Sequence, residues 1–192
     1  MISWLLFGFT LLVLGIFTYY LFKFNKQKSV VKKYNKIYFS IYFILSALAL
    51  AFSIVAIIIY VERYKIFNVI DYWTNHWIKP VMVLDILATI SLVGIIILLF
   101  FFVYLFAIKL TDKEIQYLGE KVEYSNIVKI ILDDKTKFIY INFKSGKRTY
   151  KRIKYSPKNP FTEILISNAK QIGHEIENGD ANAYFKKISG RV

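Results

Sequence analysis

Cysteine is absent from this chain of 192 residues, and histidine occurs only twice, at His76 and His174. Without thiols there can be no disulfide bonds, no thiolate catalysis and no cysteine-ligated zinc or iron–sulfur site. Two histidines about a hundred residues apart also argue against a histidine-rich metal site within one chain. The sequence therefore predicts neither a metal nor another cofactor.

The motifs of common enzyme classes are missing as well. The chain contains no G-x-S-x-G, no H-E-x-x-H and no glycine-rich phosphate loop. Asp133 and Asp134 stand together, but the stretch around them has the composition of a turn, so we interpret them as part of a hairpin and not as a metal site. We therefore expect no catalytic residues and a protein that works by binding.

Acidic residues are scarce, and the excess of positive charge is concentrated in two blocks. The chain has 26 Lys and Arg against 13 Asp and Glu, a net charge of +13. Segment 23–36, KFNKQKSVVKKYNK, holds six lysines and no acid, and segment 109–192 holds seventeen basic and ten acidic residues. Such a distribution is typical of a membrane protein that is oriented by its loops.

Three long apolar segments indicate how the chain is organised. A hydrocarbon core about 30 Å thick needs about 20 apolar residues in a helix. Three segments of the chain meet this requirement, and we expect them to be transmembrane helices: residues 2–22, 37–61 and 81–108. They would form a membrane domain of residues 1–108, in which residues 62–80 are an interfacial segment between the second and third helices.

The lysines of segment 23–36 predict the direction of the chain. Short loops rich in Lys and Arg stay in the cytoplasm. The amino terminus and residues 62–80 would then lie outside, and residues 109–192 would lie in the cytoplasm. We expect the protein to be a multi-pass protein of the cytoplasmic membrane.

The segment between the second and third predicted helices is rich in aromatic residues. Phe67, Ile70, Trp73 and Trp77 recur at helical spacings, which is typical of a short helix lying in the membrane interface. The face could anchor the chain in the interface, or it could meet an extracellular peptide or a membrane partner.

Small residues follow one face of the second predicted helix, and such faces let membrane helices approach closely. Its members are Ser46, Ala49, Ser53 and Ala56, and we expect similar packing at Gly8, Gly15, Ala88 and Ser91. They could mediate packing of the three helices or of a homodimer, or line a transport pathway.

Asp85 is the single charge within the predicted helices. Intramembrane carboxylates are often functional. Because Asp85 lies only five residues after Pro80, about 7–8 Å along a helix, it would be near the outer interface and could be structural instead.

After Lys109 the hydrophobic pattern changes to an alternation typical of half-buried strands. The predicted strands are Ile115–Leu118, Lys121–Tyr124, Ile127–Leu132, Phe138–Phe143 and Arg148–Ile153. Asn159 and Pro160 then indicate the start of an amphipathic helix that continues past Ile172 and Ile176 and ends near Gly179. A short final helix would contain Tyr184, Phe185 and Ile188. We expect a small β-rich α+β cytoplasmic domain, residues 109–192.

The stretches LTDKEIQYLGEKVEYSNIVKII and KFIYINFKSGKRTYKRIKY, followed by a helix, resemble the bacterial pleckstrin-homology-like (PH-like) domains. The resemblance covers roughly residues 105–178. It implies an antiparallel sheet or barrel with a C-terminal helix, acting as a binding or oligomerisation module without catalytic residues. Some proteins of this kind accompany bacteriocin self-immunity. The chain departs from the family in showing five clear strands where the full fold has seven, or six or seven if residues near 104–110 and a split second hairpin contribute, and in having three apolar segments where two are common.

A run of cations without an acid lies around the last predicted strand. Its members are Lys144, Lys147, Arg148, Lys151, Arg152, Lys154 and Lys158. They could be an ordinary solvated surface, a face for anionic lipid headgroups, or a contact for the acidic surface of a protein. Nucleic acid is disfavoured, because the domain directly follows a membrane helix and lipid is closer.

These observations together predict a non-catalytic integral membrane protein of the bacterial cytoplasmic membrane. Its cytoplasmic domain would bind or scaffold through lipid, a partner membrane protein or self-association. One alternative is an immunity protein against a membrane-active peptide, in which the aromatic outer segment or the helices would meet the toxin. Another is a transporter or channel subunit, for which Asp85 would have to matter.

Overall fold

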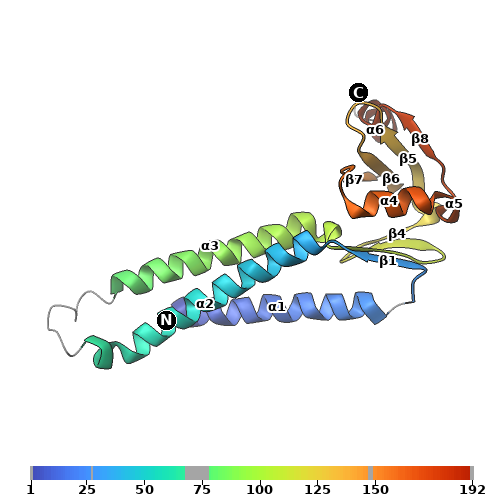
Figure 1. Ribbon diagram of the computed structural model, residues 1–192. Coiled ribbons are helices and arrows are strands. Elements are labelled where there is room, and N and C mark those ends of the chain that lie inside the picture. Colours follow the sequence, from blue (N-terminus) through green and yellow to red (C-terminus); the bar gives the residue numbers. More distant parts are fainter. Residues whose placement is uncertain (1, 27, 68–77, 147–148, 191–192) are drawn as a thin grey trace. The chain divides into compact units, whose positions relative to one another are not determined.

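The computed structural model describes residues 2–26, 28–67, 78–146 and 149–190, with the side chains of 63–67 and 171 excepted (Figure 1). The chain divides into two compact units, each built from two separate stretches of sequence. The first unit comprises Met1–Lys26 and Lys36–Val103, and the second comprises Gln27–Asn35 and Tyr104–Val192.

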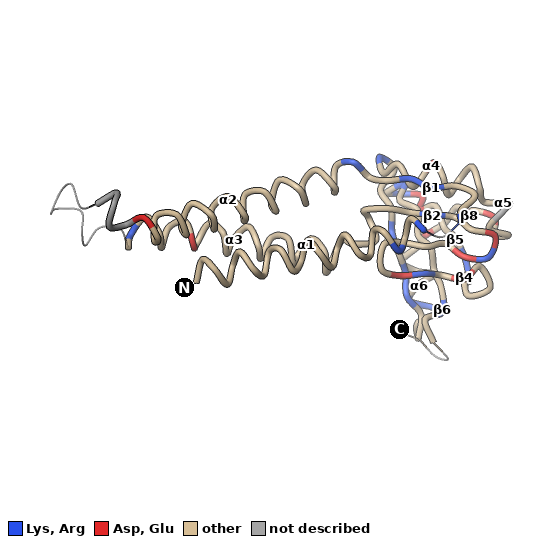
Figure 2. The backbone as a smooth tube through the Cα atoms, turned by 90° about the horizontal axis from the view of Figure 1, so that it is seen from below, with Lys and Arg blue, Asp and Glu red and all other residues tan. Residues whose placement is uncertain are grey.

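The first unit consists of three long helices, α1 (Ile2–Lys26), α2 (Lys36–Phe67) and α3 (Ile78–Phe102). All three are long and apolar enough to cross a membrane. Figure 2 shows that charged residues are rare along their length. Most of their large apolar side chains are exposed, which soluble proteins avoid. Three candidate transmembrane helices therefore indicate a membrane protein.

The small-residue face of α2 is buried against the other helices, as predicted. Ser46, Ala49, Ser53 and Ala56 are at most 3% exposed. The hydroxyls of Ser46 and Ser53 donate to the carbonyls of Tyr42 and Ala49, both at 2.8 Å, so that both hydroxyls are satisfied within the helix. These residues serve packing within the chain.

Helix α1 packs along a much narrower line than the sequence suggested. Its buried residues are Ser3, Thr10, Phe17 and Phe24, one in every seven. The predicted close packing at Gly8 and Gly15 is not found within the chain, because a Cβ placed on either glycine would meet nothing within 4 Å, and packing there against a second copy stays a prediction.

The second unit contains a sheet, here called sheet A, to which the linker between α1 and α2 contributes a strand. Its order is β1 (Val31–Tyr34), β2 (Ala107–Leu110), β3 (Glu114–Tyr117) and β4 (Lys121–Glu123), all antiparallel. Gly119 closes the turn between β3 and β4 with a φ of 107°, a conformation that favours glycine. The third apolar helix ends at Phe102, before the predicted end at 108, because the following residues turn through η2 (Val103–Leu105) and enter β2.

A second sheet, sheet B, follows after the short turn η3 (Tyr124–Asn126). It contains β5 (Ile127–Asp133), β6 (Ile139–Lys144), β7 (Tyr150–Tyr155) and β8 (Ile176–Gly179), in the order β7-β6-β5-β8. The pairing of β5 with β8 is parallel, whereas a fully antiparallel sheet was expected. Asp133 ends β5 in a turn, as the hairpin interpretation predicts.

Three helices complete the second unit: α4 (Pro160–Ser167), α5 (Ala169–Ile172) and α6 (Ala181–Ser189). The side chain of Asn159 caps α4, and Pro160 occupies its first turn, as predicted. The predicted continuation of this helix through Ile176 to near Gly179 is wrong. Gly173 adopts a left-handed φ of 74° and ends α5, so that Ile176 begins β8.

The apolar core of the second unit lies between the two sheets and α4. The ring of Tyr155 lies 6.3 Å from that of Tyr117 and 5.7 Å from that of Phe161, which joins sheet A, sheet B and α4. Burial raises the pKa of both tyrosines, so their hydroxyls stay neutral. Helix α6 covers the outer face of sheet B, where Ala181 packs on Ile131 and Tyr140. The second unit is therefore a sheet-rich domain that ends in a helix.

Candidate functional site

Four polar side chains form a straight line across the polar face of sheet A. Lys32 pairs with Lys109, Lys109 with Gln116, and Gln116 with Lys121, so each strand contributes one residue. Side chains alternate along a strand, which puts the apolar neighbours of Lys109 on the opposite, core-facing side. We call these four residues the lysine row.

The centre of the lysine row is withdrawn from solvent. Lys109 is fully buried and Gln116 is 7% exposed, whereas the Lys121 side chain at the end of the row is 66% exposed. Burial lowers the pKa of the Lys109 ammonium and the charge of Lys32 lowers it further, while Glu114 raises it. The buried centre of the row therefore holds a positive charge that water solvates poorly.

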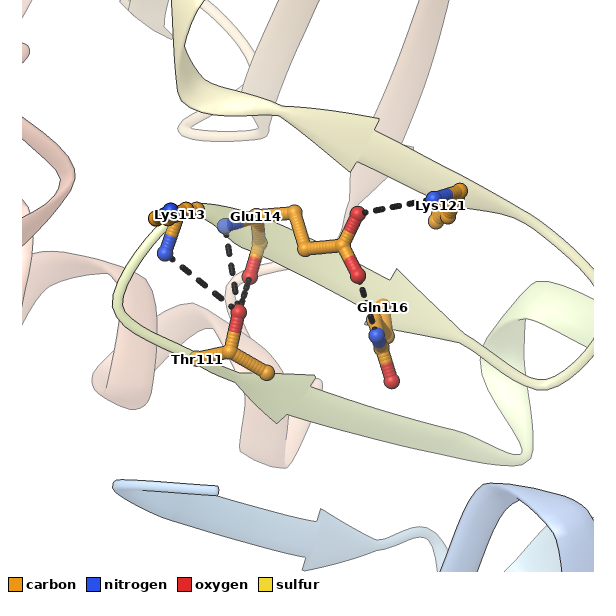
Figure 3. Close-up of polar contacts among 5 residues, drawn as sticks. All are labelled: Thr111, Lys113, Glu114, Gln116 and Lys121. Carbon is orange, nitrogen blue, oxygen red and sulfur yellow. Dashed lines mark hydrogen bonds and ion pairs between the residues drawn. The ribbon is translucent and has the colours of Figure 1, made fainter. Parts of the chain in front are cut away.

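Glu114 is the carboxylate that stabilises the row (Figure 3). One of its oxygens lies 3.3 Å from the Lys121 ammonium, and the other accepts a hydrogen bond from the Gln116 amide. Glu114 is held there by the turn before it, in which the hydroxyl of Thr111 accepts from the backbone N–H groups of Lys113 and Glu114 at 3.4 and 3.2 Å. Glu114 thus contacts Lys121 and the Gln116 amide directly, and its charge acts on the Lys109 ammonium as well.

A depression of about 810 Å³ opens beside the row, at the turn between β2 and β3. Lys28, from the linker that contains β1, lines it together with Lys113, Asp112 and Glu123. Its wall is fixed by Tyr124, whose hydroxyl donates to the Thr111 carbonyl at 2.7 Å. The depression offers charges of both signs on a turn that is held by hydrogen bonds, and such a surface suits the binding of a charged group.

The described members of the predicted basic run do not gather on one face. Lys151 lies 3.5 Å from Glu120. Arg152 points to the other side of β7, where it donates to Asn182 at 2.8 Å and lies 4.8 Å from the Phe185 ring. These contacts attach α6 to sheet B. They account for the position of Arg152 without a bound ligand.

The other members of the run are dispersed. Lys154 lies over the ring of Phe138 at 5.9 Å, and Lys144 lines a separate depression of about 460 Å³. Lys147 and Arg148 lie outside the described residues. β7 is the edge of sheet B, and lysines on an edge strand discourage pairing with other chains.

Asp85 has a structural partner. Its carboxylate accepts a hydrogen bond of 2.6 Å from the hydroxyl of Ser3, which ties α3 to α1. Of the predicted outer aromatic face, Phe67 is the last residue of α2, with its side chain not described, while Ile70, Trp73 and Trp77 lie outside the described residues.

Within the described part of the chain, no group of three or more His, Asp or Glu side chains could hold a metal ion. The polar groups of the lysine row and the depression are instead engaged by one another and by backbone atoms. This arrangement can bind charged groups.

Comparison with known proteins gives one similarity. A family model described as "Uncharacterised protein YtsF" matches residues 113–184. No curated protein and no solved structure matches the chain. The similarity begins just before β3 and ends within α6, so it concerns the second unit and carries no activity.

Sequence reasoning did not find the lysine row because its residues come from two distant parts of the chain, Lys32 from the linker and the other three from residues 109–121. The available signal was Lys109 itself, a lone cation at the end of a long apolar run. Its alternation with Ile108 and Leu110 would have indicated a strand with one polar face.

Proposed function

We propose that the protein is a non-catalytic component of the bacterial cytoplasmic membrane, and that its second unit is a PH-like binding or scaffolding domain. The amino terminus would lie outside and the domain in the cytoplasm. The two packed sheets and the terminal helix support the PH-like assignment. The three apolar helices and the two basic blocks support the location.

The observation that carries the proposal is the pairing of β1 with β2. β1 lies in the lysine-rich linker between α1 and α2, and β2 follows α3. Strands of one sheet must lie on the same side of a membrane, so the linker and the domain share a compartment if the helices span it. The positive-inside rule assigns both to the cytoplasm on separate grounds.

A domain whose first strand comes from between two membrane helices is suited to work at the membrane surface. The lysine row and the depression offer it charged groups for a partner. We propose that the partner is the acidic surface of a membrane protein, a second copy of this chain, or the headgroups of anionic lipids. Each basic residue near an anionic membrane contributes about 1 kcal/mol.

The orientation can be tested with single cysteines, because the natural chain has none. Ser145 is exposed in the loop between β6 and β7. An impermeant maleimide should label a Ser145→Cys variant only after the cells are permeabilised. Labelling in intact cells would overturn the proposed orientation.

The partner can be identified by crosslinking in native membranes. A photoreactive residue would be placed at position 113 or 121, beside the depression and the lysine row, and at position 163 on the exposed side of α4 as the matched control. We expect a protein or lipid adduct from the first two positions and not from the control. Equal background at all three positions would contradict a binding role for this face.

A further inference from the structure

β1 is held to sheet A along its whole length. Four residue pairs join Val31–Tyr34 to Ala107–Leu110. Two backbone hydrogen bonds flank them: Val30 N–H donates to the Leu110 carbonyl at 2.9 Å, and Asn35 N–H donates to the Phe106 carbonyl at 2.8 Å. The linker between α1 and α2 is therefore a structural part of the domain.

The two strands of this pair are connected to different helices. β1 joins α1 to α2, with Asn35 alone between β1 and α2. β2 follows α3 after a few residues. A displacement of α1 and α2 relative to α3 would therefore pull on the β1–β2 pair through a short stretch of chain.

The same pair contains an unfavourable contact. Lys32 is directly opposite Lys109, and like charges directly opposite each other destabilise a strand pair. Lys109 is fully buried, so solvent screens the repulsion poorly. β1 is also a short edge strand, which has a neighbour on one side only.

We propose that β1 is a releasable strap, which detaches from β2 when α1 and α2 move relative to α3 and so transmits the state of the helices to the domain. Release changes the candidate site in two ways. It uncovers the edge of β2 with Lys109, and it removes Lys28 from the depression that Lys113 and Asp112 also line. The inference goes beyond the binding role and holds for any partner.

The first test measures how stably β1 is paired with β2. Hydrogen exchange would be measured by mass spectrometry on the full-length protein in nanodiscs, comparing β2 with the central strand β6. Lys32→Glu turns the like pair into an opposite pair, while Lys33→Glu makes the same change of charge opposite Ile108. We expect about threefold to tenfold slower exchange in β2 for Lys32→Glu, and less than about twofold change for Lys33→Glu.

The second test concerns transmission from the helices. Ser3→Ala removes the hydrogen bond between α1 and α3, whereas Thr10→Ala removes a bond within α1, from Thr10 to the Leu6 carbonyl. Both residues lie on the buried line of α1. We expect Ser3→Ala to speed exchange in β2 by about twofold to tenfold, with β6 unchanged, and Thr10→Ala to have no such effect.

Two results would overturn the proposal. If Lys32→Glu and Lys33→Glu protect β2 equally, the like-charge pair does not control the strap. If Ser3→Ala leaves exchange in β2 unchanged, or changes β2 and β6 alike, the strap does not report the arrangement of the helices.

Discussion

The two units of this protein are each stabilised internally, and by different kinds of contact. In the first unit, small residues such as Ala49 and Ser53 let helices approach, and Ser3 with Asp85 provides a polar tie. In the described part of the second unit, eight short strands depend on pairing with one another, and two of the pairs, β1 with β2 and β5 with β8, join segments far apart in the sequence. The comparison teaches that apolar length defines the first unit, whereas strand pairing defines the second and brings the linker into it.

The largest effect should come from the core of the second unit. Phe161 is fully buried against Tyr155, so Phe161→Ala should cost about 3–5 kcal/mol in the free energy of unfolding of this unit. Hydrogen exchange of the full chain would rise across sheets A and B and stay unchanged in α1–α3. Ile166→Ala, on the exposed side of the same helix, is the control. A uniform rise in both units would show that they do not unfold separately.

A smaller effect should be confined to the first unit. Ala49 is fully buried, and Ala49→Leu would overpack the helix contact at a cost of about 1–3 kcal/mol. Ala51, two residues on and exposed, gives the matched control Ala51→Leu. Resistance to unfolding by SDS, followed by circular dichroism, should fall for the first variant alone. Equal loss in both would contradict packing of α2 through its small-residue face.

At the lysine row, Lys109→Met should stabilise the second unit by about 1 kcal/mol at pH 7, because it removes a buried cation. The lowered pKa of Lys109 sets the pH dependence. The unfolded chain binds more protons between the lowered folded pKa and the ordinary value of 10.5, so the natural protein gains stability as pH rises through this window. The advantage of Lys109→Met should therefore shrink toward pH 10, as thermal unfolding at several pH values would show. Destabilisation at pH 7 would mean that the ammonium is needed for the fold.

The smallest effect should come from the turn that holds α6. The backbone N–H and then the hydroxyl of Thr136 lower the pKa of Asp133, with help from the N–H groups of Ala181 and Lys135. Because the folded pKa is depressed, this contribution is present above the unfolded value of about 3.8 and is lost as pH falls through the folded pKa. Asp133→Asn should lower the thermal midpoint at pH 7. It should also make the decrease of the midpoint at acid pH shallower. Asp134→Asn should leave the fall of the thermal midpoint at acid pH unchanged. A shallower fall in both variants would contradict the assignment of this effect to Asp133.

Much of the fold could be predicted from the sequence. The three helices follow from apolar length alone. The predicted strands from Ile115 to Phe143 correspond to β3, β4, β5 and β6 within a residue at each end, because alternation and turn residues are local signals. The sheet-rich domain with a terminal helix was likewise expected.

β7 (Tyr150–Tyr155) was predicted two residues too early, as Arg148–Ile153, whereas the other strands depend on pairing that a local pattern does not reveal. The lysines of β1 made it look like a plain loop, and β2 continues the apolar run of α3. β8 was missed because Ile176 stands at helical spacing from Ile172, although Gly173 ends the helix. The lysine row was missed for the same reason, since register alone aligns its residues.

The most direct test of the account is whether the linker between α1 and α2 pairs with β2 in native membranes. Tyr34 and Ala107 are opposite each other, and the chain has no natural cysteine to interfere. A Tyr34→Cys/Ala107→Cys variant should form an intramolecular disulfide under mild oxidation, whereas Lys33→Cys/Ala107→Cys, one residue out of register and on the other face, should not. Equal or absent crosslinking in the two variants would contradict a sheet that includes the linker, and with it the proposed strap.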